Sequence, residues 1–312
     1  MTFHTLHIPD SPAVVEQAIA LLSEQFGADE GALERRQLSG EEVGVNDDTL
    51  FYALDGDRFV GMIHLTVSEA TRHGLLSGLI VLPECRGTGV GRTLFGMAVA
   101  KYDEIGGDTL YLGTSNLAAA RMYRTFGFAF ETGTNMMYRT SALSLLPLYG
   151  KNLQFGTVRD ADRSLRVNLI PLVSRRGSTI LKDANTGLAD NAFLTQLSTA
   201  GLFPRYLDIL EAGGAVRVVW ETVSRLPAAL GSRVTINGRR YADAFGIAGT
   251  EAAVLPAILE SLIGGEPAYA RILPSDTEKI RLFTRLGFVP TDETDTLTLN
   301  GLPFTVRIYH RA

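Results

Sequence analysis

The chain has 312 residues, of which 46% are hydrophobic and 20% charged, with a mean hydropathy of +0.11 and a formal net charge of −5. This composition is typical of a globular protein, the length favours two domains, and no apolar run is long enough to span a membrane. The single cysteine, Cys85, excludes internal disulfides and a cysteine metal cluster, and the five histidines lack metal-ligand spacing, so we expect no metal site.

Hydrophobic periodicity predicts the elements of the first half. In chain order they are a strand at 2–8, helices at 12–26 and 29–37, strands at 49–54, 58–68 and 75–82, a helix at 90–105, a strand at 109–114, a helix at 116–126 and a strand at 134–140. Asp55-Gly56 predicts a hairpin between two of these strands.

Residues 80–92, Ile-Val-Leu-Pro-Glu-Cys-Arg-Gly-Thr-Gly-Val-Gly-Arg, join a predicted strand to a predicted helix. The unpaired N–H groups and the dipole at a helix start favour a bound anion there. Glycines let the backbone approach phosphate oxygens closely, and Arg86 and Arg92 can add charge-assisted hydrogen bonds. The segment therefore predicts a pyrophosphate site.

Two better-known glycine motifs do not fit this segment. Gly87, Gly89 and Gly91 are each two residues apart, whereas the dinucleotide motif needs its third glycine three residues after the second. The P-loop needs Gly-Lys-Ser/Thr, but Gly91 is followed by Arg92 and Thr93. A nucleotide hydrolase is therefore disfavoured.

The spacing Arg86-Gly87-x-Gly89-x-Gly91 instead resembles the acetyl-coenzyme A loop of the GNAT N-acetyltransferase superfamily. Residues 116–128, Asn-Leu-Ala-Ala-Ala-Arg-Met-Tyr-Arg-Thr-Phe-Gly-Phe, follow at the right distance and resemble the family's second motif. Two motifs in the family's order are hard to obtain by chance.

The resemblance implies a role for each motif. The strand before the loop would pair with the pantetheine arm, the loop would hold the pyrophosphate, and Asn116 would hydrogen-bond the pantetheine or order the strands. Tyr123 would protonate the departing thiolate, since a phenol is a neutral donor at physiological pH. The implied acetyl-CoA-binding residues are Leu79, Ile80, Val81, Arg86, Gly87, Thr88, Gly89, Val90, Gly91, Arg92 and Asn116.

Each of these side chains also has a purely structural interpretation. Tyr123 lies on the apolar face of its helix, where core packing alone would explain it. Asn116 suits a helix N-cap, which is compatible with ligand binding, and Arg92 could be a solvated helix residue. The sequence identifies no clear base for the acceptor amine. His64, Glu69 and, more weakly, His73 are candidates, and a water chain is equally plausible.

Acidic residues are concentrated in the first half. Residues 1–150 contain 10 Lys and Arg against 18 Asp and Glu, whereas the remainder contains 19 against 16, which argues against nucleic acid as a partner of the first half. In the family the first two helices wall the acceptor pocket, where acidic residues would attract a cationic amine. Solvated surface is the alternative for the residues concerned, which are Glu30, Glu34, Glu41, Glu42, Asp47 and Asp48.

The second half resembles a further copy of the same fold. Gly264-Gly265 precede a strand at 268–272, a helix at 276–285 and Leu286-Gly287-Phe288, as Gly106-Gly107 precede their counterparts, and Asn237-Gly238 predicts a hairpin. Residues 171–200 give the weakest pattern, with turns predicted at 175–177 and 185–187.

This second copy is degenerate. Its loop, Phe-Gly-Ile-Ala-Gly-Thr-Glu at 245–251, lacks an arginine and the repeated glycines, and Glu251 would repel a pyrophosphate. Phe283 takes the place of the tyrosine, and Ser275, not an asparagine, is expected to open the helix. We infer loss of acetyl-CoA binding, with a scaffold role favoured over substrate binding.

The sequence thus predicts an α/β (α+β) protein of two tandem GNAT-like domains, each a mixed, mostly antiparallel sheet flanked by helices. Residues 1–145 would be the GNAT domain with the acetyl-CoA loop, and 146–312 the degenerate copy. The expected function is transfer of acetyl from acetyl-CoA to a primary amine of a small molecule by direct attack. The alternative is a non-catalytic CoA-binding sensor or partner protein. We expect a cytoplasmic protein without nucleic-acid or membrane partners, and a homodimer is compatible with this view.

Overall fold

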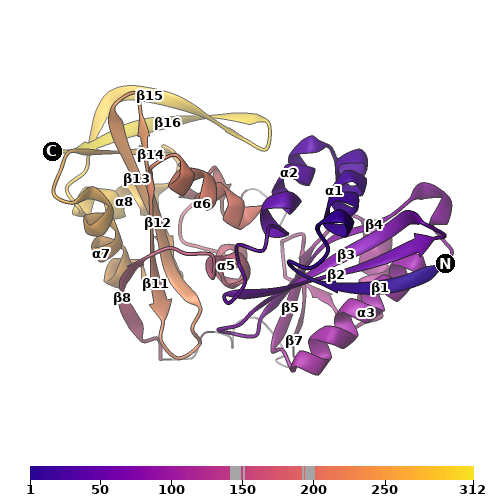
Figure 1. Ribbon diagram of the computed structural model, residues 1–312. Coiled ribbons are helices and arrows are strands. Elements are labelled where there is room, and N and C mark those ends of the chain that lie inside the picture. Colours follow the sequence, from indigo (N-terminus) through magenta and orange to yellow (C-terminus); the bar gives the residue numbers. More distant parts are fainter. Residues whose placement is uncertain (141–148, 150–151, 192, 194–200) are drawn as a thin grey trace. The chain divides into compact units, whose positions relative to one another are not determined.

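A computed structural model describes residues 1–140, 149, 152–191, 193 and 201–312 of the chain. The chain forms two compact units, shown in Figure 1. The first unit holds Met1–Glu131 and the strand β7 (Met136–Thr140), and the second holds most of the remaining described residues, including Leu202–Ala312. The predicted boundary at 145/146 lies outside the described residues, so the two domain ranges remain a prediction.

The first unit is built on a seven-stranded sheet of order β1-β2-β3-β4-β5-β7-β6. Its other elements are β1 (Thr2–His7), α1 (Pro12–Phe26), α2 (Ala28–Gln37), β2 (Asn46–Asp55), β3 (Arg58–Ser68), β4 (Gly74–Val81), a 3-10 turn (Pro83–Cys85), α3 (Val90–Ile105), β5 (Thr109–Gly113), α4 (Leu117–Arg124) and β6 (Ala129–Phe130).

The two faces of this sheet carry different helices. A Cβ on Gly61 of β3 would point at Val90 and Leu94 of α3. A Cβ on Gly78 of β4 would point at Leu22 of α1. Figure 1 accordingly shows α1 and α2 on one side of the sheet and α3 on the other. Apolar side chains from both layers pack on the sheet and form the core of the unit.

Strands β4 and β5 are the one parallel pair of the first sheet within the described residues, and they diverge. They pair at Gly74 with Leu110 and at Leu75 with Tyr111, near the start of β4. Beyond Leu75 no pairing joins the described parts of the two strands, so the sheet opens toward the carboxyl end of β4. Ligands of open α/β sheets bind at such carboxyl ends.

The second unit has a sheet of order β15-β16-β14-β13-β12-β11-β8. Its elements are β8 (Phe155–Asp160), α5 (Leu165–Ser174), β9 (Leu181–Asp183), β10 (Leu188–Ala189), α6 (Leu202–Glu211), β11 (Ala215–Glu221), β12 (Pro227–Ile236), β13 (Arg239–Gly246), α7 (Glu251–Ile263), β14 (Ala268–Ile272), α8 (Thr277–Arg285), β15 (Val289–Leu299) and β16 (Leu302–Arg311). Alternate residues of β11 and β12 pack on α5 and α6 on one face and on α7 on the other.

The two sheets share one topology. Reading the second sheet from β8 gives the strand sequence of the first, and its parallel pair, β13 with β14, occupies the place of β4 with β5. After each terminal helix, a glycine of positive φ lies against an arginine of the last strand. These pairs are Gly127 with Arg139 and Gly287 with Arg311. The fold class predicted from the sequence is confirmed.

The structure refines three sequence expectations. The loop of the first hairpin is Gly56-Asp57, one residue later than predicted, because Asp55 still pairs with Arg58. Asn237-Gly238 forms its hairpin with both residues at positive φ, as a type I′ turn requires. The N-cap of α8 is Asp276, whose side chain accepts from the Lys279 amide, so Ser275 is not the residue in register with Asn116.

No helix in the described part of the chain combines the length and the apolar character needed to cross a bilayer.

Candidate functional site

A groove of about 500 Å³ opens where β4 and β5 diverge. It is bounded by the end of β4, the loop before α3 and one face of α4. Most of the residues that sequence reasoning assigned to acetyl-CoA line it, as does Tyr123. The full lining is Leu79, Val81, Cys85, Arg86, Gly87, Gly89, Gly91, Arg92, Asn116, Ala118, Ala119, Met122 and Tyr123.

The glycine loop, residues 86–91 at the start of α3, exposes its backbone to this groove. Gly87 and Gly89 have φ values of 78° and 95°, which L side chains rarely adopt, and a Cβ at either position would meet nothing within 4 Å. Gly89 is the N-cap of α3 and has no side chain with which to satisfy the first N–H groups of that helix. The loop therefore presents unshielded amides and open space at a helix N-terminus, which suits a phosphate group.

Two arginines flank the loop, each held by the protein. Arg86 is exposed, and its Nε donates to the Val81 carbonyl at 3.0 Å. Arg92 donates from Nη1 to Thr125 Oγ1 at 3.0 Å, and its guanidinium lies over the Phe126 ring. These contacts hold both positive charges beside the groove, and Arg86 also interacts electrostatically with the Glu84 carboxylate.

Three of the predicted ligand residues do not line the groove. Ile80 and Val90 are buried in the core, where they help fix the strand and the helix that carry the loop. Thr88 turns its hydroxyl inward and donates to the Cys85 carbonyl at 2.7 Å. In the structure these side chains shape the loop, and ligand contact at these positions would have to come from the backbone.

Asn116 is the N-cap of α4. Its Oδ1 accepts from the amides of Ala118 and Ala119 at 2.9 and 3.2 Å, which leaves the side-chain amide nitrogen as its donor toward the groove. The structural interpretation of Asn116 is thus confirmed, and it leaves room for a ligand hydrogen bond.

Tyr123 is 7% exposed and stacks on Phe95, with ring centroids 4.6 Å apart. Among the residues that the structure describes, none accepts a hydrogen bond from its hydroxyl, and the residue lines the groove. Burial raises the pKa of the phenol to about 12, so it stays protonated at neutral pH. Tyr123 therefore packs in the core and also offers a donor to the groove.

A buried cluster of charged groups lies behind β4, and sequence reasoning did not resolve it. His64 on β3 is 0% exposed, with Nδ1 2.8 Å from Glu34 Oε1 and Nε2 2.7 Å from Asp48 Oδ1. Burial lowers the pKa of His64, but the charge of Glu34 and the hydrogen bonds to both carboxylates outweigh it and raise the pKa to about 9. The imidazole is therefore protonated at neutral pH.

The protonation of His64 decides whether it can be the general base for the acceptor amine in the expected acetyl transfer. A doubly protonated imidazole has no lone pair to accept a proton, so His64 is not a general base. His73 is neutral, because burial lowers its pKa to about 4, and its Nδ1 is engaged with the Tyr111 hydroxyl at 3.1 Å. Glu34 Oε1, which is hydrogen-bonded to His64, lies 3.8 Å from where a Cβ on Gly78 would stand, and Glu34 is not among the residues that line the groove.

Of the six acidic residues considered for the acceptor pocket, the side chain of Glu30 lies outside the described part of the structure, and the other five divide into two groups. Glu34, Glu42 and Asp48 are 2–5% exposed, so solvated surface is the wrong interpretation for these three. Glu41 is exposed and Asp47 is half-buried.

Comparison with known proteins identifies a family for part of the chain. The sequence model of the acetyltransferase (GNAT) family matches residues 15–128. A search of curated proteins found no match to the chain.

The solved structures to which the chain is similar include three bacterial proteins. A GNAT acetyltransferase from Staphylococcus aureus Mu50 is 17% identical over 45% of this chain and 100% of its own, with a TM-score of 0.36. The aminoglycoside 6'-N-acetyltransferase from Enterococcus faecium is 16% identical over 46% and 99%, with a TM-score of 0.35. ElaA from Escherichia coli is 19% identical over 44% and 98%, with a TM-score of 0.37.

The fold and the groove define an α/β domain in which a glycine-rich loop at a helix N-terminus lies beside two diverging strands. The match to residues 15–128 assigns this segment to the acetyltransferase (GNAT) family, as its two motifs predicted. Among the described residues no group of three or more His, Cys, Asp or Glu side chains is arranged to hold a metal ion.

Gly89→Ala provides a test of the loop. The substitution forces an L residue to φ 95° and should cost about 1–2 kcal/mol of stability, and its methyl group would also project into the groove and weaken acetyl-CoA binding. Gly213→Ala is a matched control, since Gly213 has φ 76° and open space but lies in the second unit. Calorimetric titration should show weaker binding in Gly89→Ala alone. Equal affinities in both variants would contradict a ligand at the loop.

Proposed function

We propose that the first unit transfers an acetyl group from acetyl-CoA to a primary amine of a small molecule, by direct attack of the amine on the thioester. The observation that carries this proposal is the groove itself, which brings the open glycine loop, the Asn116 side chain and the Tyr123 hydroxyl to one surface. The family match supports acetyl transfer in general.

Different residues of the groove would bind different parts of acetyl-CoA, the acyl donor. Amides of the loop and the charge of Arg86 and Arg92 would hold the pyrophosphate at the start of α3. The backbone edge of β4 near Leu79 would pair with the pantetheine arm, because β5 has diverged from it there, whereas the Val81 carbonyl already accepts from Arg86. The thioester would then lie next to the α4 face that carries Tyr123.

The transfer forms one bond and breaks another. The amine nitrogen bonds to the acyl carbon, and the bond from that carbon to sulfur breaks. Tyr123 donates its proton to the departing sulfur and recovers one from water, which the raised pKa of the phenol permits because the hydroxyl is protonated at neutral pH. The ammonium loses one proton to water before the attack, since His64 cannot accept it and an amine of pKa about 10 is mostly protonated. The nitrogen loses a second proton to water once it has bonded to the acyl carbon.

The charge behind β4 favours a cationic acceptor. Glu34 and Asp48 share a single imidazolium, so the cluster of these three residues carries a net negative charge if both carboxylates are ionised. Glu34 lies just behind Gly78, one residue before the groove-lining Leu79. A negative potential at this point would attract an ammonium group toward the thioester.

A panel of primary amines tests the proposal. Wild-type protein should release the CoA thiol from acetyl-CoA faster in the presence of at least one amine, with an N-acetylated product of matching yield. A CoA-binding sensor would bind acetyl-CoA without thiol release for any amine, and that result would replace the transferase with the alternative. A product without dependence on the amine would indicate hydrolysis and would also reject the proposal.

A further inference from the structure

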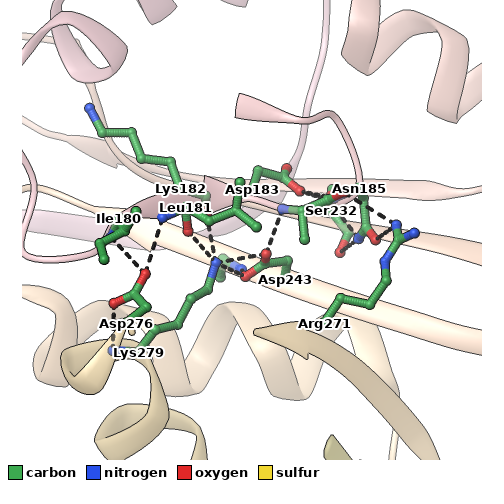
Figure 2. A network of polar contacts seen from close by, with 12 residues as sticks. Ile180, Leu181, Lys182, Asp183, Asn185, Ser232, Asp243, Arg271, Asp276 and Lys279 are labelled. Atoms are coloured by element: carbon green, nitrogen blue, oxygen red, sulfur yellow. Dashed lines mark hydrogen bonds and ion pairs between the residues drawn. The ribbon is translucent and has the colours of Figure 1, made fainter. Parts of the chain in front are cut away.

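In the second unit the two parallel strands diverge as β4 and β5 do in the first. A segment of the second unit itself lies where they diverge. β13 and β14 pair at Tyr241 with Tyr269, at the start of both strands, and then diverge. In the first unit the corresponding opening leads to the groove. In the second unit, residues 178–185, including β9, run beside β13 and α8, and we call them the inner segment (Figure 2).

Helix α8 binds the backbone of the inner segment through its N-cap. Asp276 stands in register with Asn116, because Phe283 lies as far from Asp276 as Tyr123 lies from Asn116. Asp276 Oδ2 accepts from the amides of Ile180 and Leu181 at 2.6 and 3.1 Å. The position that faces the groove in the first unit thus binds peptide N–H groups in the second.

Lys279 makes the next contacts along the same helix face. It stands in register with Ala119, another residue that lines the groove of the first unit. Its Nζ donates to the carbonyls of Leu181 and Lys182 at 2.6 and 3.1 Å and pairs with Asp243 at 2.6 Å, as Figure 2 shows. The Lys279 side chain is wholly buried.

Both diverging strands contribute to the same network. Asp243 of β13 accepts from the Ala184 amide at 2.7 Å through Oδ2. Arg271 of β14 donates to the Ala184 carbonyl at 3.3 Å and to Asn185 Oδ1 at 3.1 Å. Asn185 in turn donates to the Tyr241 carbonyl at 3.1 Å, at the point where the strands part. The inner segment therefore bridges the two strands.

The outer end of the inner segment reaches the start of α7, the counterpart of the glycine-loop helix. The Ser178 hydroxyl donates to Glu251 in the first turn of α7. Glu251 places a carboxylate where the first unit has unshielded amides, and with Ser178 and Thr179 it lines a separate hollow of about 270 Å³. The Glu251 carboxylate and its contact with Ser178 both oppose a phosphate at the first turn of α7, although Arg281 and Arg285 line the same hollow.

We propose that the inner segment is a resident ligand of the second unit: residues 178–185 occupy the strand opening that a pantetheine arm would enter, held by Asp276 and Lys279. The second unit consequently binds no acyl-CoA, and the full chain has one donor site. This inference concerns the second unit and stands whether or not the first unit is a transferase.

Hydrogen exchange on the full-length protein tests this occupancy. The amides of Ile180, Leu181 and Ala184 are bonded to buried carboxylates, so peptides that cover the inner segment should exchange about as slowly as β13. Lys279→Met removes two carbonyl contacts and leaves Asp243 unpaired, and should speed exchange in the inner segment at least about tenfold. Lys101→Met, which loses a solvent-accessible pair with Glu104, is the matched control and should leave the inner segment protected.

Two further measurements complete the test. If Lys279→Met does not fold, Asp276→Ala replaces it, since that change removes the acceptor of two amides of the inner segment, together with the N-cap bond from the Lys279 amide, and keeps the Lys279 and Asp243 side chains. Exchange of the wild-type inner segment at the rate of an exposed loop, or no acceleration in either variant, would overturn the proposal. In an acetyl-CoA titration two sites per chain would also overturn it. No site at all would reject the proposed function of the first unit and leave the exchange data to decide this inference.

Discussion

Tyr123→Phe is expected to lower kcat about 100-fold while leaving the affinity for acetyl-CoA within a factor of about two. The change removes one hydroxyl and keeps the ring, so the stacking on Phe95 at 4.6 Å and the shape of the groove survive. The loss falls on the chemical step, because the thiolate then leaves without a proton donor. General acids contribute about 10²–10⁴-fold, and a phenol of pKa about 12 is a weak acid, which favours the lower end.

Steady-state kinetics and a parallel binding titration measure this separation of kcat from affinity. Tyr52→Phe is a matched control, because Tyr52 stacks on Phe59 in the same unit and does not line the groove. Turnover in Tyr123→Phe equal to that of the wild type would remove Tyr123 from the mechanism and leave it as a core residue. A loss of acetyl-CoA binding without loss of kcat would assign it to binding alone.

His64→Leu is expected to destabilise the first unit by about 3–5 kcal/mol at neutral pH. The leucine side chain fills much of the space of the imidazole, but it leaves the carboxylates of Glu34 and Asp48 buried without the imidazolium that they share. Removal of one member of a buried charged pair is costly because the remaining charge has neither water nor a partner. Urea unfolding monitored by circular dichroism measures the loss.

The raised pKa of His64 also predicts how the free energy of unfolding depends on pH. The pKa of His64 is about 9 in the folded protein and 6.5 in the unfolded chain, so the folded state binds the proton more tightly. Its contribution, about 3 kcal/mol, is complete below pH 6.5 and is lost as the pH rises through 9. Wild-type stability should therefore fall across this window, and His64→Leu should remove the fall between pH 7 and 9.

His73→Leu is the control for this pair of measurements. His73 is also buried, but its pKa is lowered by burial to about 4, so it is neutral throughout the window. The variant should lose the bond to the Tyr111 hydroxyl, a smaller effect, and keep the wild-type fall in stability above pH 6.5. A wild type whose stability is constant between pH 6.5 and 9 would contradict a protonated His64.

The sequence predicted the parts of the fold that depend on local patterns. The helices at 12–26 and 90–105 match the structure because their apolar faces repeat at helical spacing, and Asn116 is the N-cap that its position suggests. The glycine loop was predictable because positive φ needs glycine, as at Gly87 and Gly89. The two motifs then identified the groove before its walls were known.

Long-range contacts could not be predicted in this way. Glu34 and Asp48 lie on a helix and a strand of ordinary polar character, and only folding brings them to His64. Ile180 and Leu181, in the part of the chain with the weakest pattern, satisfy their amides with the side chain of Asp276, far along the chain, so little periodicity is required of these two residues. The burial of Lys279 could not be predicted from the sequence, since lysine side chains are usually exposed.

The most direct test of the central claim is calorimetric titration of the full chain with acetyl-CoA, beside Arg86→Glu and Arg159→Glu. Both variants make the same change of net charge, but Arg86 borders the groove, whereas Arg159 is exposed on β8 of the second unit. We expect one site per chain in the wild type and in Arg159→Glu, and no measurable binding in Arg86→Glu. Absence of binding in the wild type, or equal binding in all three proteins, would contradict a donor site at the glycine loop.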